Sequence, residues 1–165
     1  LYSSAASDVY KRQACNGANG VATFSGTGPD GKYYLYMETI GGGAGGRSYK
    51  DGSDGIQVHV TNTSNLPVEA LENEYPLLVD RYELIEDSGG AGKWRGGLGL
   101  RRVYRGIDHT LTFSGQGERA VKAPWGLFGG ESGGTAAISL LSDNGKREAL
   151  AIKPVSYTHL RAHET

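Results

Sequence analysis

The sequence predicts a mainly β protein, a β-rich α+β fold of antiparallel strands with long glycine-rich loops and one short helix. Glycine is abundant and proline scarce, with 27 and 5 residues in a chain of 165. Short hydrophobic segments recur along the chain with turn signals between them, as in proteins built from antiparallel strands. Only residues 62–76 have the pattern of a helix.

The first predicted strand covers residues 33–39 and follows a turn at residues 26–31. Its side chains alternate along the segment, and a strand places alternate side chains on opposite faces of a sheet. One face carries Tyr33, Leu35 and Met37, and the other carries Tyr34, Tyr36 and Glu38.

A second strand is predicted at residues 56–60, after a glycine-rich loop at residues 41–55. Alternation gives it an apolar, inward face and a polar face that carries Gln57 and His59. The inward residues are Ile56, Val58 and Val60.

The predicted helix lies within residues 62–76. Pro67 suits the first turn, and Glu69 follows it, where the helix dipole favours a negative charge. Pro76 ends the segment, so the helix has two turns at most.

The later strands are expected at residues 77–86, 98–104, 109–114, 136–141 and 148–152. In the second of these, Leu98, Leu100 and Tyr104 share a face opposite Arg101 and Arg105. Glycine-rich loops at residues 87–99 and 115–134 separate the longer strands, and the Asn-Gly pair at residues 144–145 predicts a hairpin between the last two.

The two ends of the chain have a different character from residues 14–154. Residues 1–13 and 155–165 show no strand or helix periodicity, and both resemble peptides that arise when sequencing-adaptor DNA is translated. The alternative is a pair of ordinary disordered tails, and both interpretations exclude these residues from the fold. We therefore expect residues 14–154 to be a partial domain, a fragment of a larger one.

Composition excludes several classes of function. Seventeen basic and 18 acidic residues nearly balance, with no basic run, which argues against a nucleic-acid partner. No apolar run approaches the length of a membrane span. The single cysteine, Cys15, excludes a disulfide framework and suits the cytoplasm.

Residues 41–48 come close to a phosphate-binding P-loop, with Arg47 in the place of the lysine. A P-loop must open a helix, and residues 49–55, rich in glycine and aspartate, cannot form one. Nucleotide binding is therefore rejected for this chain. Anion binding by a nest of backbone amides stays open.

His59 is the histidine with the most suggestive setting, because it precedes Asn65 and Glu69 on the polar side of a predicted strand. It could serve as a general base or as one metal ligand. The alternative, favoured by spacing alone, is an exposed histidine without a catalytic role. His109 opens a strand after a turn, and we expect a structural role for it.

The run from residue 41 onward resembles the hydantoinase B/oxoprolinase family. The resemblance rests on Asn65-x-Pro67-x-Glu69, Tyr75-Pro76 and Arg81-Tyr82, and most of all on the glycine-rich stretch at residues 87–97 with Arg95. Downstream, Arg119, Pro124-Trp125-Gly126 and Gly129-Gly130 continue it.

The resemblance implies one half of an ATP-dependent enzyme that opens cyclic amides or imides, such as N-methylhydantoin and 5-oxoproline. Related members carboxylate ketones, which is one alternative for this chain. A hydantoinase A-type subunit or domain would bind ATP and Mg²⁺, and this chain would not. A divalent metal ion would have its ligands mostly outside this chain, which is expected to be inactive by itself.

Within this family, we expect the polar residues around the predicted helix to lie on one wall of a cleft. The catalytic candidates are Asp54, His59 and Glu69, and the substrate-binding candidates are Arg47, Asn65 and Arg95. The other alternative is a non-catalytic structural or subunit-interface module, which would show an open apolar face and no convergent polar cleft.

Overall fold

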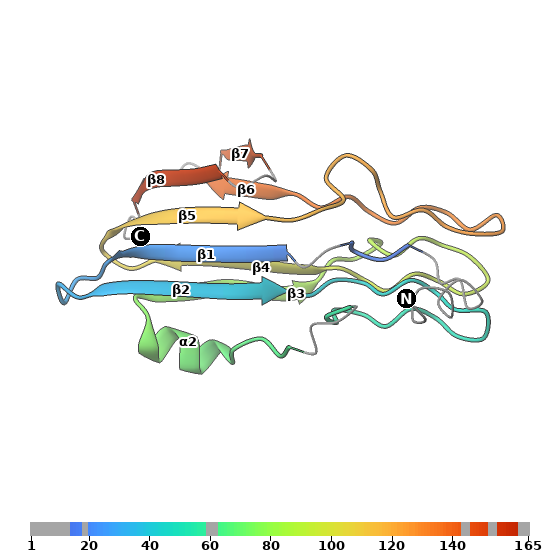
Figure 1. Ribbon diagram of the computed structural model, residues 1–165, viewed down its shortest axis with the longest axis horizontal. Helices are drawn as coiled ribbons and strands as arrows, with labels where there is room; N and C mark the ends of the chain where they lie inside the picture. Colours follow the sequence, from blue (N-terminus) through green and yellow to red (C-terminus); the bar gives the residue numbers. More distant parts are fainter. Residues whose placement is uncertain (1–13, 18–19, 59–62, 143–145, 152–154, 162–165) are drawn as a thin grey trace, which may run out of the picture.

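The main sheet has four antiparallel strands in the order β2-β1-β5-β8 (Figure 1). The computed structural model describes residues 14–17, 20–58, 63–142, 146–151 and 155–161. The strands of this sheet are β1 (Gly20–Thr27), β2 (Tyr33–Ile40), β5 (Thr110–Gln116) and β8 (Val155–Arg161).

A two-stranded ribbon of β3 (Leu77–Leu84) and β4 (Leu100–Gly106) lies behind this sheet (Figure 1). The helix α2 (Val68–Glu74) precedes β3 and packs against it. A second antiparallel ribbon consists of β6 (Ile138–Leu141) and β7 (Arg147–Leu150). The prediction of a mainly β fold with antiparallel strands and one short helix is confirmed.

The helix forms where the prolines predict it. It begins directly after Pro67, ends before Pro76, and buries Leu71 completely. Glu69 lies in its first turn, where the helix dipole stabilises a carboxylate.

The structure differs from the sequence prediction in three strands. The central strand β1 is not predicted by the sequence pattern, because its small and polar residues give no clear alternation. Residues 56–58 form no strand: Ile56 makes an isolated bridge to Gly42 and is 38% exposed, so it does not face the core. Val60, the third residue of that predicted face, lies outside the described residues.

The backbone of residues 155–161 forms β8, although the sequence predicts no regular structure there. It pairs antiparallel with β5 and so covers backbone groups that would otherwise stay unpaired at the edge of the sheet. This pairing depends on a strand that is distant in the sequence. The alternation of side chains within residues 155–161 therefore could not predict it. The domain boundary at residue 154 stays a prediction.

The core lies between the main sheet and the ribbon of β3 and β4. On β2 the inward face carries Tyr34, Tyr36 and Glu38. The ring of Phe24 on β1 packs against Tyr104 on β4, with ring centroids 4.7 Å apart. The opposite face of β2, with Tyr33, Leu35 and Met37, is exposed.

The glycine-rich loops interlock at the end of the molecule beyond the strands (Figure 1). The amide of Gly97 donates to the carbonyl of Ala44, and the amide of Gly52 donates to the carbonyl of Arg95. A Cβ on Gly97 would lie 2.0 Å from the carbonyl oxygen of Ser53, a distance that no side chain can occupy. The glycines at these positions therefore allow two backbones to touch.

Candidate functional site

A polar pocket lies beside the segment that leads into α2. Its volume is about 420 Å³, within the usual range for small-molecule sites. The lining residues come from three separate segments: Gly55, Ile56, Gln57, Thr63, Ser64, Asn65, Leu66, Pro67 and Tyr82.

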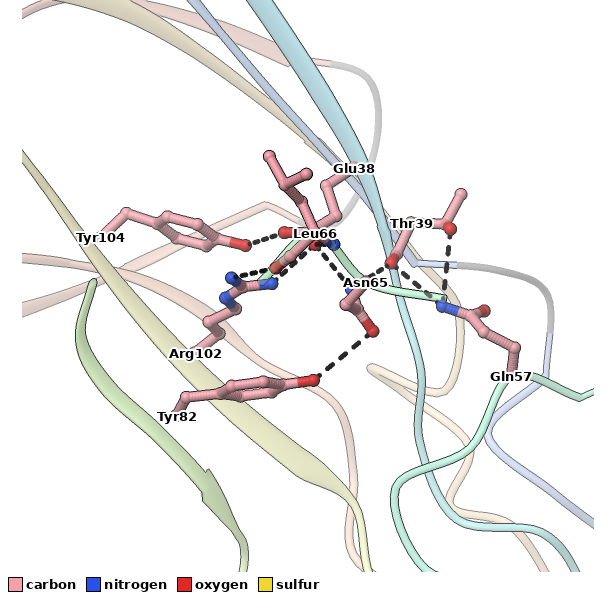
Figure 2. A network of polar contacts seen from close by, with 8 residues as sticks. All are labelled: Glu38, Thr39, Gln57, Asn65, Leu66, Tyr82, Arg102 and Tyr104. Atoms are coloured by element: carbon pink, nitrogen blue, oxygen red, sulfur yellow. Dashed lines mark hydrogen bonds and ion pairs between the residues drawn. The ribbon is translucent and has the colours of Figure 1, made fainter. Parts of the chain in front are cut away.

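Asn65 is held on the wall of this pocket by its side-chain amide (Figure 2). Its Nδ2 donates to Oε1 of Glu38 and to the carbonyl oxygen of Thr39, both at 2.8 Å. Because both acceptors are oxygens, the reversed amide would place oxygen against oxygen. The orientation is thereby fixed, and Oδ1 points toward the Tyr82 hydroxyl, 3.5 Å away.

Glu38 is the centre of the network behind Asn65. Its Oε1 accepts from Nη1 of Arg102 at 2.6 Å and from the backbone amide of Leu66 at 3.2 Å. Its Oε2 accepts from the Tyr104 hydroxyl at 2.6 Å. Both charged side chains are buried, with exposures of 5% for Glu38 and 0% for Arg102.

The carboxylate form of Glu38 is stabilised by these partners. Burial opposes ionisation, but the hydrogen bonds from Tyr104 and Asn65 and the charge of Arg102 outweigh it and lower the pKa of Glu38. Burial and the adjacent carboxylate raise the pKa of Tyr104, so its hydroxyl stays protonated as a donor.

Arg102 also fixes the ring of Tyr82. Its guanidinium carbon lies 4.5 Å from the centre of the Tyr82 ring, within the range of a cation–π interaction. Its Nη2 donates to the carbonyl of Leu66 at 3.2 Å. One buried ion pair thus supports both polar side chains, Asn65 and Tyr82, that face each other at the pocket.

Gln57 supplies a second side-chain amide to the pocket wall. Its Nε2 donates to the carbonyl oxygen of Thr39 at 3.0 Å and to the Thr39 hydroxyl at 3.4 Å. Its Oε1 is buried and has no hydrogen-bond partner among the described residues. The Thr39 carbonyl therefore anchors Gln57 and Asn65 together (Figure 2).

Asp54 and Arg95 form a two-point ion pair between the first two glycine-rich loops. Nη1 and Nη2 of Arg95 donate to the two carboxylate oxygens at 2.7 and 2.9 Å, and the amide of Leu98 donates to Oδ1. The Arg95 and Leu98 donors lower the pKa of Asp54 to about 2. Asp54 directly precedes Gly55, which lines the pocket.

The predicted site residues fall into distinct settings. Asn65 lines the pocket, whereas Asp54 and Arg95 bind each other beside it. Glu69 is exposed in the first turn of α2, and Arg47 donates to the Tyr49 hydroxyl at 3.3 Å. His59 lies outside the described residues.

Sequence reasoning missed Glu38, Arg102 and Tyr82 as site residues. A signal was present for two of them. Glu38 alternates with Tyr34 and Tyr36 on one face of β2, and Arg102 falls between Leu100 and Tyr104 in the alternation of β4. Two opposite charges on inward faces indicate a buried ion pair.

His109 has the structural setting expected for it. It is 9% exposed, and its Nε2 lies 2.6 Å from the Tyr34 hydroxyl. Its Nδ1 lies 2.7 Å from the carbonyl oxygen of Ile107, which can only accept a hydrogen bond. In the neutral imidazole, Nδ1 therefore carries the proton, and Nε2 accepts from Tyr34.

Four amides of the first glycine-rich loop are engaged in hydrogen bonds within the fold. The amides of Gly42, Ala44, Gly52 and Gly55 all donate to backbone carbonyls of the neighbouring segments. Among the described residues, no group of three or more His, Cys, Asp and Glu side chains is placed to hold a metal ion. Across the same ranges, no helix is both long and apolar enough to cross a membrane.

Comparison with known proteins identifies relatives of this chain. The hydantoinase B/oxoprolinase family model matches residues 4–165. A protein of Pseudomonas sp. (strain NS671) that is named as the B-type subunit of a D-/L-hydantoinase is 38% identical over 133 residues, which are 80% of this chain and 22% of the relative. The 5-oxoprolinase 1 of Arabidopsis thaliana is 39% identical over 129 residues, 78% of this chain and 10% of that protein.

A solved structure shares the fold. The nucleotide-free structure of acetone carboxylase superposes with a TM-score of 0.61 at 21% identity, over 75% of this chain and 17% of that one. The chain thus spans about a fifth or less of the length of these relatives. With the family model matching nearly its whole length, this chain belongs to the hydantoinase B/oxoprolinase family.

Proposed function

We propose that this chain is part of the B-type component of an ATP-dependent enzyme that opens cyclic amides or imides of the hydantoin or 5-oxoproline type. Family membership and the named relatives support the class of reaction. The observation that carries the proposal is the pocket at Asn65, where an oriented side-chain amide faces a tyrosine hydroxyl. The likeness to acetone carboxylase, at 21% identity, supports the fold alone.

Within this proposal, Asn65 contacts the substrate, and Asp54 and Arg95 hold the glycine-rich loops at the rim of the site. Glu69 and His59 are the candidates for proton transfer, since an exposed carboxylate and an imidazole can act as general acid or base. Arg47 is proposed to attract the charged part of the substrate.

The proposed partner is a hydantoinase A-type subunit that binds ATP and Mg²⁺ and activates the substrate. The name of the Pseudomonas relative, which makes it one component of a hydantoinase, supports a two-component enzyme. Four amides of the first glycine-rich loop donate to backbone carbonyls and are therefore not free to bind phosphate. This supports ATP binding by the partner.

The proposal is tested with the intact protein that contains this chain, co-expressed with an A-type subunit. We expect ATP-dependent ring opening of hydantoin or 5-oxoproline, measured as ring-opened product together with ADP. Glu69→Gln should lower turnover at least about tenfold without unfolding, because Glu69 is exposed and the loss of a general acid or base costs that much or more. Wild-type turnover in this variant would remove Glu69 from the mechanism, and an assembled complex that opens no cyclic amide would refute the function.

A second candidate, a subunit-interface module, is favoured by the loop that follows β5. Val121 is 92% exposed, Trp125 52% and Phe128 101%, so three large apolar side chains lie at the surface of one loop. Large exposed apolar side chains on one loop favour a role in contact with another protein surface. Val121→Ser/Phe128→Ser should then weaken co-purification with the A-type subunit and leave the thermal midpoint unchanged, because both side chains are almost fully exposed.

A further inference from the structure

The two polar groups that face each other at the pocket have complementary hydrogen-bonding roles. Asn65 presents Oδ1, an acceptor, because both hydrogens of its Nδ2 are engaged by Glu38 and Thr39. Tyr82 presents a hydroxyl 3.5 Å from this oxygen, at the outer limit of a hydrogen bond. A contact this long leaves the hydroxyl able to turn and donate to a ligand.

We propose that Asn65 and Tyr82 form a recognition pair for the edge of a cis amide. In a small ring the amide is held cis, so its N–H and its C=O point to the same side. The ligand N–H would donate to Oδ1 of Asn65, and the Tyr82 hydroxyl would donate to the ligand carbonyl oxygen. This inference deepens the proposed function by naming the group that the pocket recognises, and it rests on that function only for the subsequent ring opening.

The buried ion pair preorganises both members of the recognition pair. Glu38 fixes the amide of Asn65 through Oε1, and Arg102 fixes the ring of Tyr82 from 4.5 Å. Arg102 also binds Glu38 directly. The Glu38–Arg102 ion pair thus positions both the acceptor of Asn65 and the ring of Tyr82. Little conformational entropy is therefore lost when a ligand binds them.

The pair predicts a clear selectivity. A ketone has a carbonyl but no N–H, so it would leave Oδ1 of Asn65 without a donor. An open-chain secondary amide is trans and directs its N–H away from the side of its carbonyl. A site built to hydrogen-bond a ligand group rejects analogues that lack the group. We therefore assign Asn65 and Tyr82 as specificity-determining residues that favour ring amides over ketones.

Direct binding to the intact protein that contains this chain, without an A-type subunit, tests this assignment. Affinities are measured by NMR titration for 2-pyrrolidone, N-methyl-2-pyrrolidone, cyclopentanone and N-methylacetamide. Only 2-pyrrolidone presents an amide N–H and a carbonyl on the same side of the molecule. We therefore expect it to bind at least about tenfold more tightly than the other three. The largest chemical-shift changes that 2-pyrrolidone causes in the protein should occur at the Asn65 side-chain amide.

Tyr82→Phe removes the hydroxyl alone, and Tyr82 is 46% exposed, so the fold should persist. We expect its affinity for 2-pyrrolidone to fall about threefold to tenfold, as for the loss of one hydrogen bond. Tyr33→Phe, at a tyrosine 71% exposed on β2, is the matched control and should bind as the wild type does.

Equal binding of cyclopentanone and 2-pyrrolidone, an unchanged affinity in Tyr82→Phe, or no binding of 2-pyrrolidone would each overturn the assignment. Ring opening by the assembled enzyme is assayed separately, so failure of the recognition pair is distinguished from failure of the proposed function. Selective binding of 2-pyrrolidone together with no turnover in the complex would support the recognition pair and refute the proposed function instead.

Discussion

Oε1 of Glu38 on β2 and Nη1 of Arg102 on β4 lie 2.6 Å apart, inside the layer between the main sheet and the ribbon. Both side chains are almost completely withdrawn from solvent. Desolvating two charges is costly, and the cost is offset only when further hydrogen bonds surround the pair, as Tyr104 and Asn65 do here.

Removing one partner of this pair should be strongly destabilising. Arg102→Met leaves the Glu38 carboxylate buried without its cation, and we expect a loss of about 3–5 kcal/mol in the free energy of unfolding. Urea denaturation followed by circular dichroism measures it. The double variant Glu38→Gln/Arg102→Met has no uncompensated charge and should be more stable than Arg102→Met alone. A double variant that loses the sum of the two single effects would contradict the coupling.

Tyr34→Phe should destabilise the chain through His109. The substitution leaves the buried Nε2 of His109 without its donor, which costs about 1–3 kcal/mol. Burial raises the pKa of Tyr34 to about 12, so the wild-type hydroxyl stays a donor throughout the neutral range. Tyr33→Phe, on the exposed face of β2, should change stability by no more than about 0.5 kcal/mol. Equal effects of the two substitutions would show that the buried hydrogen bond contributes nothing.

The Asp54–Arg95 pair should make stability depend on pH in the acid range. The pKa of Asp54 is lowered to about 2 in the folded chain, against about 4 for an unfolded aspartate. A lowered pKa contributes stability that is fully present above pH 4 and is lost as the pH falls toward 2. Because the pair is partly exposed, we expect only about 1 kcal/mol from it.

Carboxyl-carbon NMR reports this titration directly. The Asp54 signal should titrate with a midpoint near pH 2 in the wild type and at a higher pH in Arg95→Gln, which has lost the cation but keeps the Leu98 amide as a donor. In Asp54→Asn, the free energy of unfolding should fall less between pH 4 and pH 2 than it does in the wild type. An Asp54 midpoint near pH 4 in the wild-type chain would exclude the ion pair in solution.

Gly97→Ala should disrupt the contact between the glycine-rich loops. The added Cβ would lie 2.0 Å from the carbonyl oxygen of Ser53, and rigid backbone cannot give way as a side chain would. We expect a loss of at least about 2 kcal/mol in the free energy of unfolding.

Gly99→Ala is the matched control in the same loop, since its Cβ would meet nothing closer than the Ser88 hydroxyl at 3.6 Å. It should unfold within about 0.5 kcal/mol of the wild type. Similar losses in the two variants would mean that the close approach at Gly97 does not limit stability.

Elements with local signals could be predicted from the sequence, whereas those defined by their neighbours could not. The helix α2 lies between Pro67 and Pro76, and proline acts on the residues beside it. Strand β1 has few strongly apolar residues, and what makes it central is its pairing with β2 on one side and β5 on the other.

The candidate site shows the same division. Asn65 is predictable because it lies in a recognisable motif next to the helix. Glu38 and Arg102 are 64 positions apart, and each resembles an ordinary charged residue within its own strand. Alternation shows that both face inward, but which side chains meet is decided when the ribbon packs on the sheet.

The interlocked glycine loops give the most distinctive run of this sequence a structural role. In residues 87–99, Gly90 and Gly97 lie against other stretches of backbone, where a single added carbon would collide. Such a motif marks the places where chain crosses chain. The motif thus leads to a contact between loops, and the polar pocket lies beside that contact.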